Sequence, residues 1–149
     1  MDMPIAPELT EPSAFAGHLA EWLDDLAPKP LEKLLEEADG PRHAAIFCVD
    51  ITNGFTKEGQ LASPRVGALI PPIVDLMTRA YDRGVRDFVL PQDAHRPDSV
   101  EFRDFPIHCV RGTSEAVTVD ELTALPFSRL FTVLPKTSIS CSIGTGLDP

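Results

Sequence analysis

The chain has 149 residues, the length of one ordinary domain, which is enough to bury a core without disulfides or a structural metal. Hydrophobic residues make up 43% of it, yet no apolar run approaches the length that spans a bilayer, which excludes a transmembrane protein. Lysine and arginine number 13 against 23 acidic residues, so the formal net charge is −10. Such a charge gives no electrostatic reason to bind nucleic acid or anionic membranes, and we expect neither partner.

The cysteines and the first residues indicate the compartment. The three cysteines include no Cys-x-x-Cys pair, so we expect neither a disulfide framework nor a zinc ribbon. The opening residues, Met-Asp-Met-Pro-Ile-Ala-Pro-Glu, carry neither the basic region nor the hydrophobic run of a signal peptide. We therefore predict a reducing, cytoplasmic environment.

The first part of the chain, residues 1–42, is predicted to be a helical extension. Apolar residues recur at helical spacing over residues 15–26, and two prolines follow them. A second short helix is predicted over residues 31–38, ended by an Asp-Gly pair. We expect the extension to pack on the main fold, and a partner-binding surface is the alternative.

Three short, continuously apolar runs predict buried parallel strands. They cover residues 44–49, a stretch from about residue 85 to just before Asp93, and residues 130–134. A helix is predicted between the first two runs over residues 66–81, kinked or restarted at Pro72 and capped by Gly84. A shorter helix is predicted near residues 119–125. The order β-α-β-α-β favours an α/β domain with a parallel sheet and right-handed crossovers.

Each predicted strand ends at, or just before, a side chain that can carry chemistry. Asp50 follows the first run, Asp93 and His95 follow the second, and Lys136 follows the third. A single charged residue at a strand end is commonly a coincidence. Because the sites of parallel α/β sheets lie at the carboxyl ends of the strands, we expect these four side chains to share one site.

The stretch from Asp93 to Cys109 carries a candidate metal site. Asp93 and His95 are two residues apart, so an extended chain turns both side chains to the same side. Glu101 and His108 can return to them through the intervening loop. Two imidazoles with one or two carboxylates, completed by water, suit Zn²⁺, Mn²⁺ or Fe²⁺. The alternative is a polar loop with exposed histidines, and Cys109 is predicted to be a buried apolar side chain.

Two further features belong to the same predicted edge. Asp50 and Lys136 form either a pair that handles the proton of a thiol or a buried salt bridge, and the sequence leaves both open. Phe55 follows Asp50 by five residues. A turn between them places its ring at the pocket mouth, where it stacks on a planar substrate, and packing in the core is the alternative.

Taken together, these motifs resemble the isochorismatase-like cysteine hydrolases and, among them, the nicotinamidases. The resemblance covers the chain from about residue 44 to its end. The matching segments are residues 50–55 (Asp-x-x-Asn-x-Phe), residues 93–95 (Asp-x-His), residues 106–113 (Pro-x-His-Cys-x-x-Gly-Thr), and Lys136 with the residues after it.

The resemblance implies a fold, a reaction and a role for each matched residue. The fold is a three-layer α/β/α sandwich with a parallel sheet, of which residues 43–149 hold the N-terminal half-sheet. The reaction is hydrolysis of a small, pyridine-type carboxamide to acid and ammonia through a thioester. The implied roles are catalytic base for Asp50, its cationic partner for Lys136, ring stacking for Phe55, and divalent-metal binding for Asp93, His95, Glu101 and His108.

One element of that family is expected elsewhere. The resemblance places the nucleophilic cysteine some tens of residues beyond the lysine, and neither Cys48 nor Cys141 fits the role. We therefore expect an incomplete sequence, with the nucleophile encoded after Pro149, and a naturally short, inactive relative is the alternative.

For the function, the alternatives are an isochorismatase-type hydrolase and a non-catalytic module. A homo-oligomer is compatible with the sequence.

Overall fold

The computed structural model describes residues 12–147 of the chain. The chain divides into two compact units, Met1–Leu34 and Leu35–Pro149. The domain boundary predicted at residue 43 stays a prediction. Within the described range, no helix is both long enough and apolar enough to cross a lipid bilayer.

The extension contains the two predicted helices. Helix α1 spans Pro12–Asp24 and α2 spans Leu31–Glu37. The bounds differ from the prediction by a few residues at the ends, where helices fray. The sequence between them holds Pro28 and Pro30, and proline disfavours helical geometry in the residue before it.

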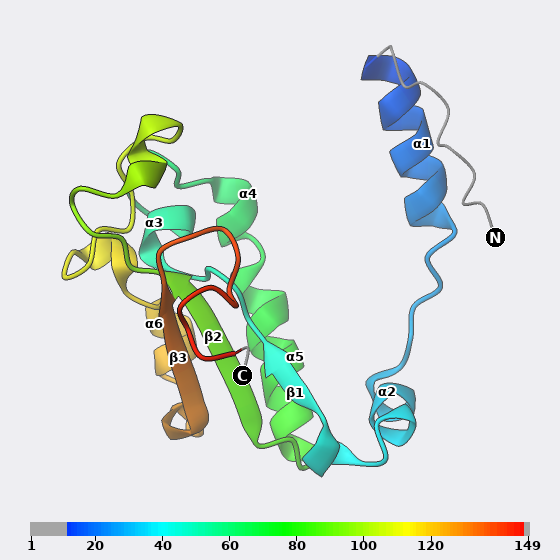
Figure 1. Ribbon diagram of the computed structural model, residues 1–149. Helices are drawn as coiled ribbons and strands as arrows, with labels where there is room; N and C mark the ends of the chain where they lie inside the picture. The colour runs from blue at the N-terminus through cyan, green and yellow to red at the C-terminus, as the bar shows by residue number, and fades with distance from the viewer. Residues whose placement is uncertain (1–11, 148–149) are drawn as a thin grey trace. The chain divides into compact units, whose positions relative to one another are not determined.

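A parallel sheet of three strands forms the centre of the second unit, as predicted (Figure 1). The strands are β1 (Ala45–Phe47), β2 (Asp87–Asp93) and β3 (Phe131–Lys136), in the order β1-β2-β3. Ile46 pairs with Phe88, and Phe88 pairs with Phe131. At the other end of the same ladder Asp93 is in register with Lys136. The register alone therefore brings two of the predicted site residues side by side.

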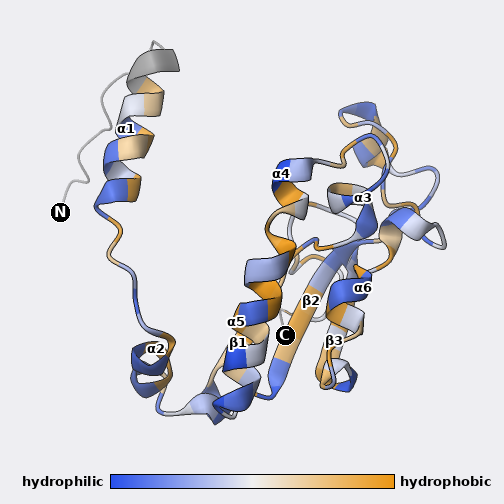
Figure 2. Ribbon diagram, turned by 180° about the vertical axis from the view of Figure 1, so that it is seen from behind, coloured by the Kyte–Doolittle hydropathy of each residue, from blue (hydrophilic) through white to orange (hydrophobic). Residues whose placement is uncertain are grey.

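The two crossover helices cover one face of the sheet. Helix α5 (Ile70–Asp82) connects β1 to β2, and α6 (Asp120–Thr123) lies between β2 and β3. Both helices lie behind the sheet in Figure 1 and in front of it in Figure 2, as expected for two successive crossovers that advance in the same direction. The largest apolar side chains of the core belong to these helices, to β2 and to the segment after α6: Met77, Phe88, Leu90, Leu122 and Phe127. The arrangement is a helical layer on a parallel sheet, as the predicted α/β class requires.

The helix between β1 and β2 is interrupted, as its prolines predict. A short helix, α4 (Pro64–Gly67), ends before α5 begins at Ile70. Pro71 and Pro72 then occupy the first turn of α5, where a missing N–H costs nothing and the fixed φ suits the helix. The restart therefore comes two residues before the position predicted.

Gly84 ends α5 in the predicted way. Its φ is +99°, in the left-handed region, and its N–H donates to the carbonyl of Tyr81 at 3.0 Å. The next N–H, that of Val85, donates to the carbonyl of Ala80, also at 3.0 Å. This pair of bonds is the Schellman motif, which favours glycine because no Cβ resists the positive φ.

Short helical turns occupy the loops. They are η1 (Pro41–His43), α3 (Asn53–Thr56), η2 (Val100–Arg103), η3 (Ser114–Ala116) and η4 (Ser128–Leu130). Of these, α3 follows β1, and η2 and η3 follow β2. These three turns therefore belong to the loops at the carboxyl ends of the strands, where the candidate site lies.

Neighbouring residues of α5 test where the core lies. Met77 is 0% exposed, whereas Leu76 beside it is 37% exposed. We expect Met77→Ala to lower the free energy of unfolding by about 2–5 kcal/mol, because it leaves a cavity under the sheet. Leu76→Ala serves as the matched control and should cost about 1 kcal/mol or less, since much less apolar area returns to water. Urea unfolding followed by circular dichroism measures both, and equal losses would contradict this placement of the core.

Candidate active site

The predicted residues of the strand ends meet at the carboxyl edge of the sheet. The chain continues alongside β2 after β1 ends: the N–H of Cys48 donates to the carbonyl of Val89, and that of Asp50 to the carbonyl of Pro91, both at 2.9 Å. Asp50 is thereby fixed beside the end of β2. Its carboxylate oxygen Oδ1 accepts the backbone N–H of Asp93 at 3.0 Å.

The ammonium group of Lys136 lies between two carboxylates. Its Nζ is 2.9 Å from Oδ2 of Asp50 and also donates a short hydrogen bond to Oδ1 of Asp93. The Lys136 side chain is 2% exposed, and that of Asp50 is 28% exposed. Three side chains from three strand ends thus form one continuous chain of charged hydrogen bonds. Of the three, Asp50 is the most open to solvent.

The surroundings shift the pKa values of this pair upward. Burial raises the pKa of Asp50, the hydrogen bond from Lys136 opposes this, and the negative charge of Asp93 adds to the rise. For Lys136, burial would lower the pKa, but the hydrogen bonds to Asp93 and Asp50 and the charges of both carboxylates raise it on balance. Lys136 therefore stays an ammonium at neutral pH, and Asp50 is a stronger proton acceptor than an ordinary carboxylate.

Asp50 also has an uncommon backbone conformation. Its φ is +58°, a left-handed value that a residue with a Cβ adopts at a cost. The bonds from Lys136 and from the N–H of Asp93 hold its carboxylate in place and offset that cost. Strained residues of this kind gather at functional sites.

The four predicted metal ligands form one cluster. Asp93, His95, Glu101 and His108 each offer a ligand atom, and these atoms lie within 4.8 Å of one another. Oδ2 of Asp93 is 3.4 Å from Nε2 of His95 and 3.5 Å from Nε2 of His108. Glu101 is the most distant member, with Oε2 at 3.9 Å from Nε2 of His95. Both histidines are buried, so the alternative of an exposed polar loop is wrong.

The backbone brings the two histidines together. The N–H of His95 donates to the carbonyl of Cys109 at 3.0 Å, and the carbonyl of His95 accepts from Arg111 at 2.8 Å. This short parallel bridge pairs His95 with Val110. It explains how residues separated by a long loop present their rings to the same carboxylate.

The donor set fits a divalent metal ion. Nε2 of His95 is fully buried, and no group in residues 12–147 makes a hydrogen bond to it. Nδ1 of His108 donates to the carbonyl of Pro106 at 2.7 Å, which leaves the lone pair of Nε2 facing Asp93. A buried nitrogen without a partner is costly unless a ligand uses it. Two imidazoles and two carboxylates suit Zn²⁺, Mn²⁺ and Fe²⁺ alike.

A cavity of about 230 Å³ adjoins this cluster. Its polar wall consists of Asp50, Asp93, Glu101, His108 and Lys136, and its apolar wall of Phe55, Leu61, Phe105 and Ile139. The ring of Phe55 has its centroid 5.6 Å from that of His108, with the planes tilted by 60°. The structure therefore places Phe55 in the pocket lining. All seven predicted site residues lie together, and His95 alone among them is a buried member of the cluster that does not line the cavity.

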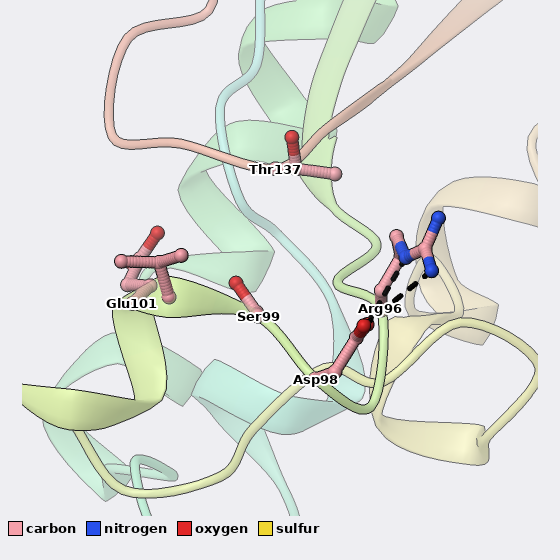
Figure 3. A pocket seen from close by; sticks show the side chains of 6 residues that line it. Arg96, Asp98, Ser99, Glu101 and Thr137 are labelled. Carbon is pink, nitrogen blue, oxygen red and sulfur yellow. Dashed lines mark hydrogen bonds and ion pairs between the residues drawn. The ribbon is translucent and has the colours of Figure 1, made fainter.

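A second cavity, of about 390 Å³, shares Glu101 with the first. All its lining residues but Val100 are polar or charged: Arg96, Asp98, Ser99, Val100, Glu101 and Thr137 (Figure 3). Arg96 and Asp98 form an exposed ion pair, with Nε donating to Oδ1 at 3.0 Å. Glu101 therefore borders both cavities.

Two of the three cysteines are buried thiols. Burial raises the pKa of Cys48 to about 11. Burial also raises the pKa of Cys109 to about 11, with the hydrogen bond between its thiol and the Thr52 hydroxyl opposing the rise. Cys109 is 0% exposed, which confirms the prediction of a buried apolar cysteine. Since the thiolate is the nucleophile, neither residue is activated for attack.

Part of the lining was not predicted. Leu61, Phe105 and Ile139 come from three different loops and form most of the apolar wall. Phe105 is 44% exposed and Ile139 is 77% exposed. No sequence signal singles them out, because isolated apolar residues are common on protein surfaces.

The buried ammonium makes a prediction about stability in the metal-free protein. Lys136→Met should lower the free energy of unfolding by about 3–5 kcal/mol at pH 7, because it leaves buried Asp93 without its cation. Since the folded state raises the pKa of Lys136, its contribution is fully present below the unfolded value of about 10.4 and is lost as the pH rises through the folded value.

Denaturant unfolding at pH 7, 9 and 11 measures this difference. Lys57→Met is the matched control, because Lys57 forms an exposed ion pair with Glu121 at 2.7 Å, and such pairs contribute about 0–1 kcal/mol. A loss for Lys136→Met no larger than that of the control would show that the buried pair does not stabilise the site.

Comparisons with known proteins identify the family to which this fold belongs. A family model described as "Isochorismatase domain" matches residues 44–149. No curated protein matches the chain.

Three similar solved structures share the fold. An N-carbamoylsarcosine amidase from Thermoplasma acidophilum is 29% identical with a TM-score of 0.61, over 70% of this chain and 57% of that one. A nicotinamidase from Bacillus subtilis is 30% identical with a TM-score of 0.59, over 69% of this chain and 60% of that one. A pyrazinamidase of Pyrococcus horikoshii, in complex with zinc, is 24% identical with a TM-score of 0.55, over 68% and 59%.

The chain therefore spans less than two thirds of the length of these structures. The family model, in contrast, covers most of this chain, from the start of the first apolar run to the last residue. The parallel sheet and the residues at its carboxyl edge fall within the matched range. The chain belongs to the isochorismatase family.

Proposed function

We propose that the protein acts as a metal-assisted cysteine amidohydrolase on a small, planar carboxamide, of the kind that nicotinamidases hydrolyse. One observation carries the proposal: three of the four residues of the donor cluster line the same cavity as the Asp50–Lys136 pair. The amide class is taken from similar structures named as an amidase and a nicotinamidase. The zinc-bound pyrazinamidase shares the fold alone, so the metal rests on the donor set of this chain.

The cavity suits a flat, mostly apolar molecule with one polar end. Phe55, Phe105 and Leu61 offer the apolar surface against which a ring would lie. The polar part of the lining holds Asp50, Lys136 and the carboxylates of the cluster. Bound by Asp93, His95, Glu101 and His108, a divalent ion would supply positive charge to hold a ring nitrogen or a water molecule. The pocket would thereby orient the carboxamide toward Asp50 and Lys136.

Asp50 and Lys136 would manage the proton of the attacking thiol. Asp50 accepts that proton, and the ammonium of Lys136 favours the thiolate and the negative charge that develops on the carbonyl oxygen. The thiolate attacks the carbonyl carbon and forms a thioester, and the C–N bond breaks as the nitrogen takes the proton held by Asp50 and leaves as ammonia. Water then hydrolyses the thioester to the acid and restores the thiol. Cys48 and Cys109 are buried with raised pKa values, so we assign the nucleophile to another cysteine of the protein.

The metal content of the purified protein is the first test of the metal site. We expect the purified protein to retain about one divalent ion per chain after dialysis. His95→Ala should weaken Zn²⁺ binding by at least about 100-fold, since loss of a ligand exceeds the 10–100-fold effect of an outer contact. His43→Ala is the control, because His43 is an exposed histidine outside the cluster. Metal analysis and competition with a chelating dye measure this. A wild-type protein without retained metal would favour the isochorismatase-type alternative.

The reaction is tested by ammonia release from nicotinamide, using the full-length gene product loaded with Zn²⁺ or Mn²⁺. Asp50→Asn should lower kcat/KM by about 10²–10⁴-fold, the usual contribution of a general base. Asp75→Asn should leave it unchanged, since Asp75 forms an exposed pair with Arg79 on α5. A metal-loaded protein that releases no ammonia from nicotinamide, pyrazinamide or N-carbamoyl amides would contradict the proposal.

A further inference from the structure

Cys109 links the two histidines of the cluster through its backbone. It directly follows His108, and its carbonyl accepts the N–H of His95. Its φ is +42°, a left-handed value in a residue with a Cβ. Such a conformation persists only where the surroundings hold it. A contact that holds Cys109 in this conformation also acts on the position of His108, its neighbour in the chain.

Glu115 makes this contact. Its Oε2 accepts the backbone N–H of Cys109 at 3.0 Å, and its own carbonyl accepts the thiol of Cys109 at 3.5 Å. A hydrogen bond from a backbone N–H to an ionised carboxylate is roughly twice as strong as one to a neutral acceptor. Glu115 therefore holds both the backbone and the side chain of Cys109. It belongs to η3, after the loop that follows His108.

Two glycines lie so close to Glu115 and Cys109 that a side chain at either position would collide with them. Gly59 has φ of +89°, and a Cβ built there would lie 2.6–2.7 Å from the three carboxyl atoms of Glu115. A Cβ at Gly54 would lie 2.6 Å from the sulfur of Cys109 and 3.0 Å from the carbonyl oxygen of Glu115. The loop that carries Phe55 thus packs directly on the carboxylate. Glu115 therefore contacts the segment of Phe55 directly, and it contacts the segments of His95 and His108 through Cys109.

We propose that Glu115 is a positioning residue of the candidate metal site, an inference that rests on the proposed function. By binding the N–H of Cys109, it holds that residue in its left-handed conformation and so directs His108 toward Asp93. Glu115 is not among the four metal ligands and does not line the 230 Å³ cavity. Its effect on the metal therefore passes through Cys109.

Zn²⁺ affinity tests the effect on the site. Glu115→Ala should weaken Zn²⁺ binding by about 10–100-fold, the range found for contacts that orient metal ligands. Glu115→Gln should restore most of the affinity, because its amide oxygen can accept the same N–H. Glu121→Ala is the matched control, since it removes an acid that is paired on the surface with Lys57. Affinities of Glu115→Ala and wild type that agree, in folded proteins, would overturn the inference.

Gly59→Ala is a second variant that acts on the same bond without removing the carboxylate. Its methyl group would meet the carboxyl atoms of Glu115 and displace them. We expect a loss of Zn²⁺ affinity similar to that of Glu115→Ala. If Glu115→Ala does not fold, Gly59→Ala decides, and wild-type affinity in that variant would count against the inference.

Labelling of Cys109 in the metal-free protein gives a readout that needs no metal. The buried thiol should react slowly with iodoacetamide in the wild type, and at least about tenfold faster in Glu115→Ala, where the segment is released. Glu115→Gln should stay close to the wild type, and peptide mapping separates Cys109 from Cys48 and Cys141. If the wild type binds no Zn²⁺, the metal of the proposed function fails, while unchanged labelling of Cys109 in Glu115→Ala would overturn this inference.

Discussion

A single buried ammonium holds the carboxyl edge of this sheet together. Lys136 comes from the end of β3, and its two carboxylate partners come from the end of β2 and from the segment that continues after β1. Without that charge, Asp50 and Asp93 would repel each other in a site that excludes much of the water. Burial raises the pKa of Asp50 although Lys136 opposes the rise, and Asp50 stays partly exposed, while the buried Lys136–Asp93 pair joins β3 to β2. The same interaction thus stabilises the strand ends and sets the electrostatic surroundings of the candidate base, Asp50.

Asp93 joins this ion pair to the metal cluster by using its two oxygens separately. Oδ1 accepts the hydrogen bond of Lys136, and Oδ2 faces the ring nitrogens of His95 and His108. The position of one group therefore depends on the position of the other. A change at Lys136 should disturb metal binding, and loss of a histidine should alter the charge that surrounds Asp50. Mutational effects at these residues are expected to be non-additive for this reason.

Hydrogen bonds between loops hold the metal-binding histidines in place. The cluster needs rigid histidines, yet His108 lies on a segment outside regular secondary structure. Backbone bonds from His95 and the carboxylate of Glu115 give that segment the definition that a strand or helix would otherwise provide. Two glycines leave the room that this arrangement requires. Precise ligand geometry on a loop thus depends on contacts from residues that touch no substrate.

Local sequence patterns were enough to predict the α/β class, the three strands, the restart of α5 near its prolines and the residues of the candidate site, because apolar runs and the polar residues that end them span only a few positions. The three-dimensional arrangement was needed to show that Asp50 and Lys136 form an ion pair, that Cys109 is held by Glu115, and that Phe105 and Ile139 line the cavity. These features join segments distant in the chain. Their geometry depends on strand register, loop paths and positive φ angles, which no local pattern of residues encodes.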